Sequence, residues 1–156
     1  MSGDFVRLVI GVYAEGEKLR SAMRELRNSG LSMHQICTVG SIAAFAPERE
    51  WPSLILESNQ LKIGCVDYCV RKVRNSAFMV SSAALFDSLW CAATNDEGPL
   101  TKWMTPAQSA TIWKVLCDDQ TLLMVNAIST AQQIICSKIQ LMQGPKFVQA
   151  YNFAVH

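Results

Sequence analysis

The chain has little excess charge, few histidines and none of the short motifs that mark common catalytic sites. Its 156 residues carry 14 Lys and Arg against 13 Asp and Glu, a net charge of +1. That balance excludes the strongly basic composition typical of proteins that bind nucleic acid or membrane surfaces. There is no G-x-G-x-x-G, no P-loop and no G-x-S-x-G, and the two histidines have no Ser/His/Asp or Cys/His spacing around them. We therefore expect no catalytic residues, no cofactor and no nucleic-acid partner.

Apolar runs long enough to span a membrane are also missing. Residues 120–137 lack charge but contain several Gln, Asn and Ser residues, and residues 76–94 contain Asp87 near their middle. The first apolar run is short and includes Arg7, unlike the core of a signal peptide. We therefore expect a cytoplasmic protein that does not contact a membrane and keeps its thiols reduced.

Six cysteines are spread through the chain, and one pair has a spacing that would suit a metal. Cys65 and Cys69 would share one face if residues 60–74 form a helix. A closed zinc site needs four ligands, and neither histidine lies near this pair in the sequence. We therefore expect free thiols that pack as small hydrophobic side chains, and no metal.

The two ends of the chain each show a strand, a helix and a second strand. At the N-terminal end, residues 1–41, the β-branched and apolar residues of 5–13 predict a strand. Apolar residues then recur at helical spacing until Gly30, where a left-handed helix cap is expected. Residues 31–41 predict the second strand of this unit.

The C-terminal end, residues 119–156, repeats this pattern. Residues 121–128 predict a strand, and Ser129 is one of two adjacent residues suited to cap the helix that follows. That helix is expected to end at Gly144, which precedes a proline, and residues 146–153 predict the last strand. The buried stripe of the helix is expected to be Ile135, Ile139 and Met142.

Two such units predict an α+β fold of the ferredoxin-like type. This fold has a four-stranded antiparallel sheet with strand order 4-1-3-2 and both helices on one face. Residues 42–118 would form a mainly helical insertion inside a single domain that spans residues 1–156. Three helices are expected within the insertion: 60–74, 83–93, and one that starts after Thr105 and ends near residue 117.

Helix caps and alternating apolar residues occur in a segment at each end of the chain, and the C-terminal segment also contains one Gly-Pro dipeptide. They lie in VIGVYAEGEKLRSAMRELRNSGLSMHQICTVGS and in MTPAQSATIWKVLCDDQTLLMVNAISTAQQIICSKIQLMQGPKFVQAYNF. In these two stretches the chain resembles a largely uncharacterised bacterial general-stress family of the heat-induced type. The resemblance implies two ferredoxin-like β-α-β units and a bacterial, cytoplasmic, stress-associated protein, and it carries over no catalytic residue.

Charge is scarce near the C-terminus, where only Lys138 and Lys146 are charged after Asp119. The solvent face of the last helix would then consist of glutamines and a serine, a composition that suits contact with a partner. If the even-numbered residues of 5–13 face the helices, the odd-numbered ones need cover from the insertion or from a second subunit. We expect a homodimer, with a different protein partner as the alternative. The interface is predicted to include Val9, Tyr13, Gln133 and Gln140.

Three functions from different classes follow from these patterns. The one we favour is a non-enzymatic, stress-associated or regulatory module that acts through self-association or a protein partner. The alternatives are a small-ligand-binding domain, with a pocket between sheet and insertion, and an enzyme that uses Cys or His chemistry without a known motif. The ligand pocket would be lined by the four tryptophans, Trp51, Trp90, Trp103 and Trp113.

Overall fold

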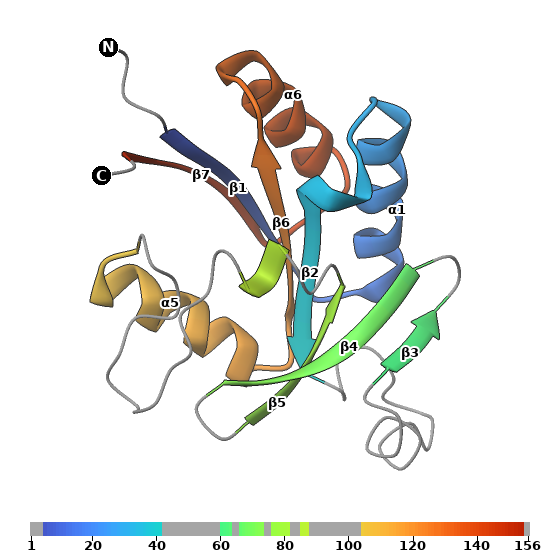
Figure 1. Cartoon of the computed structure of the whole chain (residues 1–156), viewed down its shortest axis with the longest axis vertical. Helices are drawn as coiled ribbons and strands as arrows, with labels where there is room; N and C mark the ends of the chain where they lie inside the picture. The colour runs from blue at the N-terminus through green and yellow to red at the C-terminus, as the bar shows by residue number, and fades with distance from the viewer. Residues whose placement is uncertain are drawn as a thin grey trace.

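The computed structural model describes residues 5–41, 60–63, 66–73, 76–81, 85–87 and 104–154 of the chain. Within these residues, seven strands form one antiparallel sheet in the order β3-β4-β5-β2-β6-β1-β7 (Figure 1). The strands are β1 (Phe5–Tyr13), β2 (Ile36–Ser41), β3 (Gln60–Ile63), β4 (Val66–Val73), β5 (Ser76–Ser81), β6 (Thr121–Ala127) and β7 (Phe147–Ala154). The helices are α1 (Gly16–Asn28), the 3₁₀ helix η1 (Met33–Gln35), α5 (Pro106–Cys117) and α6 (Thr130–Leu141). The predicted α+β class is confirmed.

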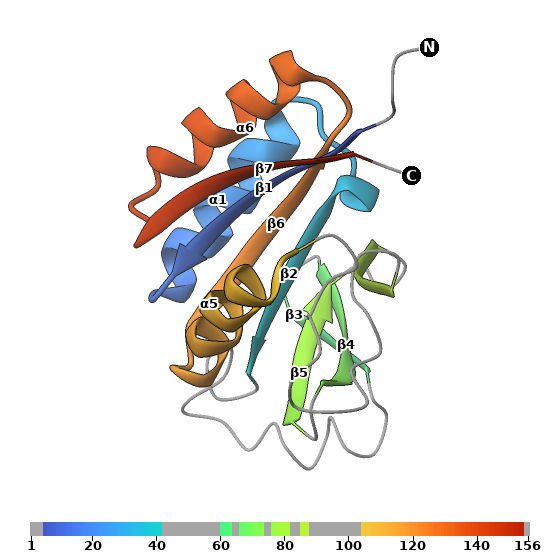
Figure 2. The same ribbon diagram turned by 90° about the vertical axis from the view of Figure 1, so that its left-hand side faces the viewer.

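The four strands from the two ends of the chain are neighbours in the order β2-β6-β1-β7. Numbered among themselves, they read 4-1-3-2 from the β7 edge, which is the predicted order. Helices α1 and α6 lie side by side on one face of the sheet, and α5 lies on the other (Figure 2). The sheet does not stop at four strands, however, because β5, β4 and β3 continue it beyond β2.

Those three additional strands correct the prediction of a mainly helical insertion. Residues 66–73 form a strand, in place of the helix predicted over residues 60–74. The valines of this segment suit both periods, but β-branched side chains favour the pleated strand, and β5 pairs with β4 from Tyr68 to Val73. Residues 85–87 are helical, and the rest of the helix predicted over 83–93 lies outside the described residues.

The caps expected from the sequence hold α5 and α6 at their ends. At the start of α5, Thr105 Oγ1 accepts a hydrogen bond from the Gln108 backbone N–H at 3.2 Å, and Gln108 Oε1 accepts one from the Thr105 N–H at 3.0 Å. At the start of α6, Ser129 Oγ accepts from the Gln132 N–H at 3.1 Å. After α6, Gly144 has a φ of 72°, the left-handed conformation that glycine adopts without strain. The predicted starts of α5 and α6 and the end of α5 are confirmed, whereas α6 ends at Leu141, before the predicted Gly144.

Two apolar cores lie on opposite faces of the sheet. Leu8, Ile10 and Val12 of β1 face the core beneath α5, whereas Val9 and Tyr13 face the core beneath α1 and α6. The alternation of β1 was therefore predicted correctly, but its two faces were exchanged. The sheet face opposite α1 and α6 is covered at least in part by α5, which belongs to the insertion.

Candidate functional site

Only one of the four tryptophans predicted to line a ligand pocket lies in the described part of the chain. Trp113, on α5, is half-buried against the core, and its ring meets that of Phe78 edge-to-face with centroids 5.7 Å apart. Trp51, Trp90 and Trp103 lie outside the described residues. Trp113 therefore acts as a packing residue between α5 and β5.

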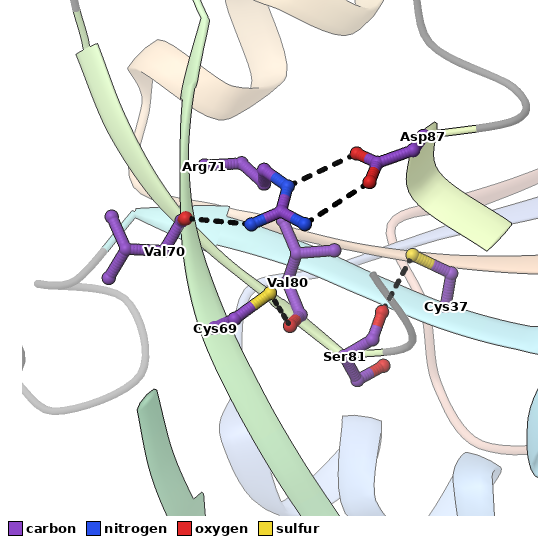
Figure 3. Close-up of polar contacts among 7 residues, drawn as sticks. All are labelled: Cys37, Cys69, Val70, Arg71, Val80, Ser81 and Asp87. Atoms are coloured by element: carbon purple, nitrogen blue, oxygen red, sulfur yellow. Dashed lines mark hydrogen bonds and ion pairs between the residues drawn. The ribbon is translucent and has the colours of Figure 1, made fainter. Parts of the chain in front are cut away.

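Two thiols and an ion pair lie together near β2, β4 and β5 (Figure 3). Cys37 Sγ donates a hydrogen bond to the Ser81 carbonyl oxygen at 3.1 Å, and Cys69 Sγ donates to the Val80 carbonyl oxygen at 3.6 Å. Arg71 binds Asp87 through two hydrogen bonds, each 3.1 Å long.

The thiols of this cluster are poor nucleophiles. Burial raises the pKa of Cys37 far above its usual range, and the nearby Cys69 and Asp87 raise it further. Burial also raises the pKa of Cys69. Both groups stay protonated at neutral pH, and the thiolate is the reactive form of cysteine.

Among the described residues, the remaining candidate ligands do not form a metal site. Cys65, the predicted companion of Cys69, lies outside the described residues, and Cys69 itself lies on a strand. His34 is an exposed residue of η1. In the part of the chain that the structure describes, no group of three or more His, Cys, Asp and Glu residues has the arrangement of a metal site.

The four residues predicted to form an interface are all buried inside the chain. Val9 and Tyr13 are buried beneath α1 and α6, and Gln133 and Gln140 lie on the side of α6 that faces the sheet. The Tyr13 hydroxyl donates to Gln140 Oε1 at 3.1 Å, and Gln133 Nε2 donates to the Tyr151 carbonyl oxygen at 3.3 Å. Burial raises the pKa of Tyr13 well above its usual range. The interface prediction is wrong for these residues, because internal hydrogen bonds satisfy the polar groups that were expected to face solvent.

A glycine in β1 makes room for this arrangement. A Cβ atom on Gly11 would overlap the Gln140 carboxamide, coming 2.9 Å from its Cδ and 3.0 Å from Cε2 of Tyr13. Only a residue without a side chain lets Gln140 lie flat against the strand and reach Tyr13. Gly11 thereby leaves the space that the Gln140 carboxamide occupies beside Tyr13.

The consequence is an apolar face of α6 that points to solvent. Its relative exposures are 51% for Ile134, 48% for Ile135, 60% for Leu141 and 82% for Met142. Lys138 lies three or four residues from each of these four positions along the helix, so it occupies the centre of the group. We call these four apolar residues the α6 face. Ile135 and Met142 were predicted to be buried, and that prediction is wrong.

The signal for this face was present in the sequence. Gln133, Cys136 and Gln140 are spaced at three and four, like the isoleucines, so two stripes competed for the core. Hydrophobicity favours the isoleucine stripe, but the fit of Gln140 over Gly11 selects the other one. The scarcity of charge after Asp119 already indicated a helix with an unusual solvent face.

Strand β7 forms one edge of the sheet beside α6. It pairs with β1 along its length, and within the described residues no strand lies on its other side. Its sequence, FVQAYNFA, contains no charged residue and no proline. The opposite edge strand, β3, has four residues and includes Lys62.

Comparisons with known proteins add no relative. No family model, curated protein or solved structure matches the chain. Among the described helices, none combines the length and apolar character needed to cross a bilayer.

Proposed function

We propose that this chain is a non-enzymatic regulatory module that acts by associating with protein, and that its first partner is a second copy of itself. The α6 face carries this proposal. Four large apolar side chains, about half exposed or more, share one side of a helix whose opposite side contains buried glutamines. A helix that only supports its own fold normally shows the reverse pattern.

The apolar area of the α6 face supports its assignment as part of a contact surface. A large side chain in the open presents about 150–250 Å², so the exposed fractions of these four residues leave roughly 400 Å² of apolar surface. The largest apolar patch on a monomeric protein is about 300–600 Å² and is often functional. A stable protein interface buries about 800 Å² on each partner. The α6 face supplies about half of that area, so a contact must extend beyond it.

Two further parts of the proposal rest on the resemblance to the general-stress family and on topology. We propose a stress-associated role, as the resemblance implies. The arrangement of β2, β6, β1 and β7 beneath α1 and α6 supports the proposal that these elements form a ferredoxin-like unit, extended by the other strands. The hydrogen-bonded, protonated thiols near Arg71 favour a non-enzymatic role over cysteine chemistry.

Gel filtration of the tagged chain in extract from its host cell tests the association. The comparison is with a variant in which Ile134, Ile135, Leu141 and Met142 are all replaced by Gln. We expect the native chain to elute well above monomer size, and the variant to elute as a monomer with an unchanged melting temperature. A native chain that elutes as a monomer in extract, or a variant that keeps its assembly, would contradict the proposed function.

A further inference from the structure

We propose that the second copy docks through the outer edge of β7. The two β7 strands would run antiparallel across a two-fold axis and join the sheets of both copies, while Ile134 and Leu141 of the two α6 helices pack together above them. This inference rests on the proposed function and specifies where its contact lies.

The composition of β7 leaves that edge open to another strand. An exposed sheet edge is a template for pairing, and proteins usually protect it with short strands, charged residues, proline or a bulge. Strand β7 has eight residues, none charged and none proline, and its register with β1 is continuous from Phe147 to Ala154. Strand β3, at the other edge, is short and includes Lys62. The two edges thus differ in the features that discourage pairing.

Contacts on either side of α6 show which part of its apolar face lies next to β7. Gln133 donates to the Tyr151 carbonyl oxygen, so its side of the helix faces β7. Helix α1 contacts α6, and Ile139, about 120° around the helix from Gln133, packs against the core cluster that includes the buried residues of α1, so its side of the helix lies toward α1. At 100° per residue, Leu141 and Ile134 lie toward the β7 side, whereas Ile135 and Met142 lie toward the α1 side. The α6 face therefore divides into two pairs.

Lys138 distinguishes edge pairing from face-to-face packing of the two helices. It lies between the two pairs, so a symmetric face-to-face contact centred on the α6 face would bring two ammonium groups together. The sequence after Asp119, which includes α6 and β7, contains no acidic residue that could neutralise the two ammonium groups. Edge pairing instead leaves Lys138 at the top of the helix, where its flexible side chain reaches water.

The edge of the sheet, with Ile134 and Leu141 beside it, offers a contact area of its own. Eight residues at about 3.3 Å each give an edge roughly 26 Å long. A sheet with a helix layer about 10 Å above it presents an edge on the order of 20 Å high, or roughly 500 Å² in cross-section. With the relief of protruding side chains such as Ile134 and Leu141, this approaches the area of a standard interface.

Two matched variants separate this geometry from other contacts. Variant I134E/L141E changes the pair on the β7 side, and I135E/M142E makes the same chemical change on the α1 side of the same helix. Sedimentation velocity of the purified chain at micromolar concentrations, under reducing conditions because Cys117 is exposed, gives the dimer dissociation constant. We expect a native dimer, a loss of about 100-fold or more in affinity for I134E/L141E, and a change of less than about threefold for I135E/M142E.

Hydrogen–deuterium exchange adds a readout specific to strand pairing. Amides of residues 147–154 should exchange more slowly as protein concentration rises, and this protection should disappear in I134E/L141E. Melting temperatures of both variants check that each remains folded.

Each outcome bears on one proposal or on both. A dimer broken by I135E/M142E but not by I134E/L141E, or exchange at β7 that is independent of concentration, would overturn the edge geometry and leave the proposed function standing. A purified monomer that elutes in a larger complex in extract would overturn both the edge geometry and self-association, and would leave standing only the proposal that the chain acts by associating with another protein. A chain that is monomeric in both settings would overturn both proposals.

Discussion

Replacing Gly11 with alanine tests the contact that orients α6. The added methyl would overlap the Gln140 carboxamide, 2.9 Å from its Cδ, where carbon atoms normally approach to about 3.5–4.0 Å. Gln140 is fully buried, and its Oε1 accepts a hydrogen bond from the Tyr13 hydroxyl. The substitution must displace a packed side chain and break a buried hydrogen bond.

The energies of these effects have opposite signs, and the clash is the larger one. Overpacking a core costs about 1–3 kcal/mol, and a buried polar group left without a partner costs about 1–3 kcal/mol. Against this, alanine in place of glycine gains about 0.4–1 kcal/mol by restricting the unfolded chain. We expect Gly11→Ala to lower the free energy of unfolding by about 2–4 kcal/mol, as measured by urea denaturation followed by circular dichroism.

Gly16→Ala is the matched control. Gly16 is the first residue of α1, and a Cβ there would meet only the flexible end of Arg20, 3.2 Å away. We expect a change within about 1 kcal/mol. Combining Gly11→Ala with Gln140→Ala should cost less than the sum of the two single changes, because the new methyl occupies space that the glutamine has left. A Gly11→Ala variant within about 0.5 kcal/mol of the native chain, or additive energies in the double variant, would refute the proposed contact.

Three further predictions concern capping, pH and an ion pair. Thr105→Ala removes the N-cap of α5 and should lower stability by about 1 kcal/mol in urea denaturation; an unchanged midpoint would contradict the role of this cap. Burial raises the pKa of Cys136 from 9.0 to about 11 and raises that of Cys37 as well, so the folded state holds these protons more tightly than the unfolded chain. The contribution of Cys136 to stability is complete below pH 9 and is lost as pH rises through 11, whereas that of Cys37 persists to higher pH. Urea midpoints should therefore fall between pH 9 and 11, and Cys136→Ala should weaken the fall; midpoints constant to pH 11 would argue against it. Asp87→Asn breaks the partly exposed pair with Arg71 and should cost less than about 1 kcal/mol, so a loss above about 2 kcal/mol would show that the pair has a larger structural role.

Local sequence signals predicted the helix caps well because the interactions that form a cap join residues close in sequence. The bond from Gln108 to Thr105, the bond from Gln132 to Ser129, and the positive φ at Gly144 all join or involve residues close in sequence. The order of the four strands β2, β6, β1 and β7 could be predicted from the two β-α-β units, since few arrangements of such units exist.

Strand β4 was missed because its apolar residues fit two periods. Val66, Val70 and Val73 have the spacing of a helix, and nothing within the segment shows that β5 will lie beside it. Strand formation depends on that non-local partner, since β-propensity largely reflects packing against neighbouring strands. The extension of the sheet beyond four strands was lost with it.

The orientation of α6 also depends on residues far apart in the sequence. The isoleucine and glutamine stripes have the same spacing, and hydrophobicity alone selects the wrong one. The choice depends on Gly11, Tyr13 and Gln140 meeting in space, which no local pattern records. The predicted interface residues were therefore buried, and the exposed residues of the same helix were overlooked.

The reversal of α6 has a cost that the single chain does not recover. Fully burying an Ile, Leu or Met side chain stabilises a fold by about 1.5–3 kcal/mol, and four such residues remain half exposed or more. Their place in the core is taken by Gln133 and Gln140, whose hydrogen bonds to Tyr151 and Tyr13 largely replace bonds to water and add little net energy. If only the stability of the single chain mattered, the isoleucine side of α6 would be expected to face the sheet and the glutamine side to face solvent. In the proposed edge geometry, part of the missing stabilisation is regained when a second molecule covers Ile134 and Leu141, because their apolar surface then leaves water on association. The proposed association therefore gives a physical reason for the apolar solvent side of α6 that the fold of the single chain does not supply.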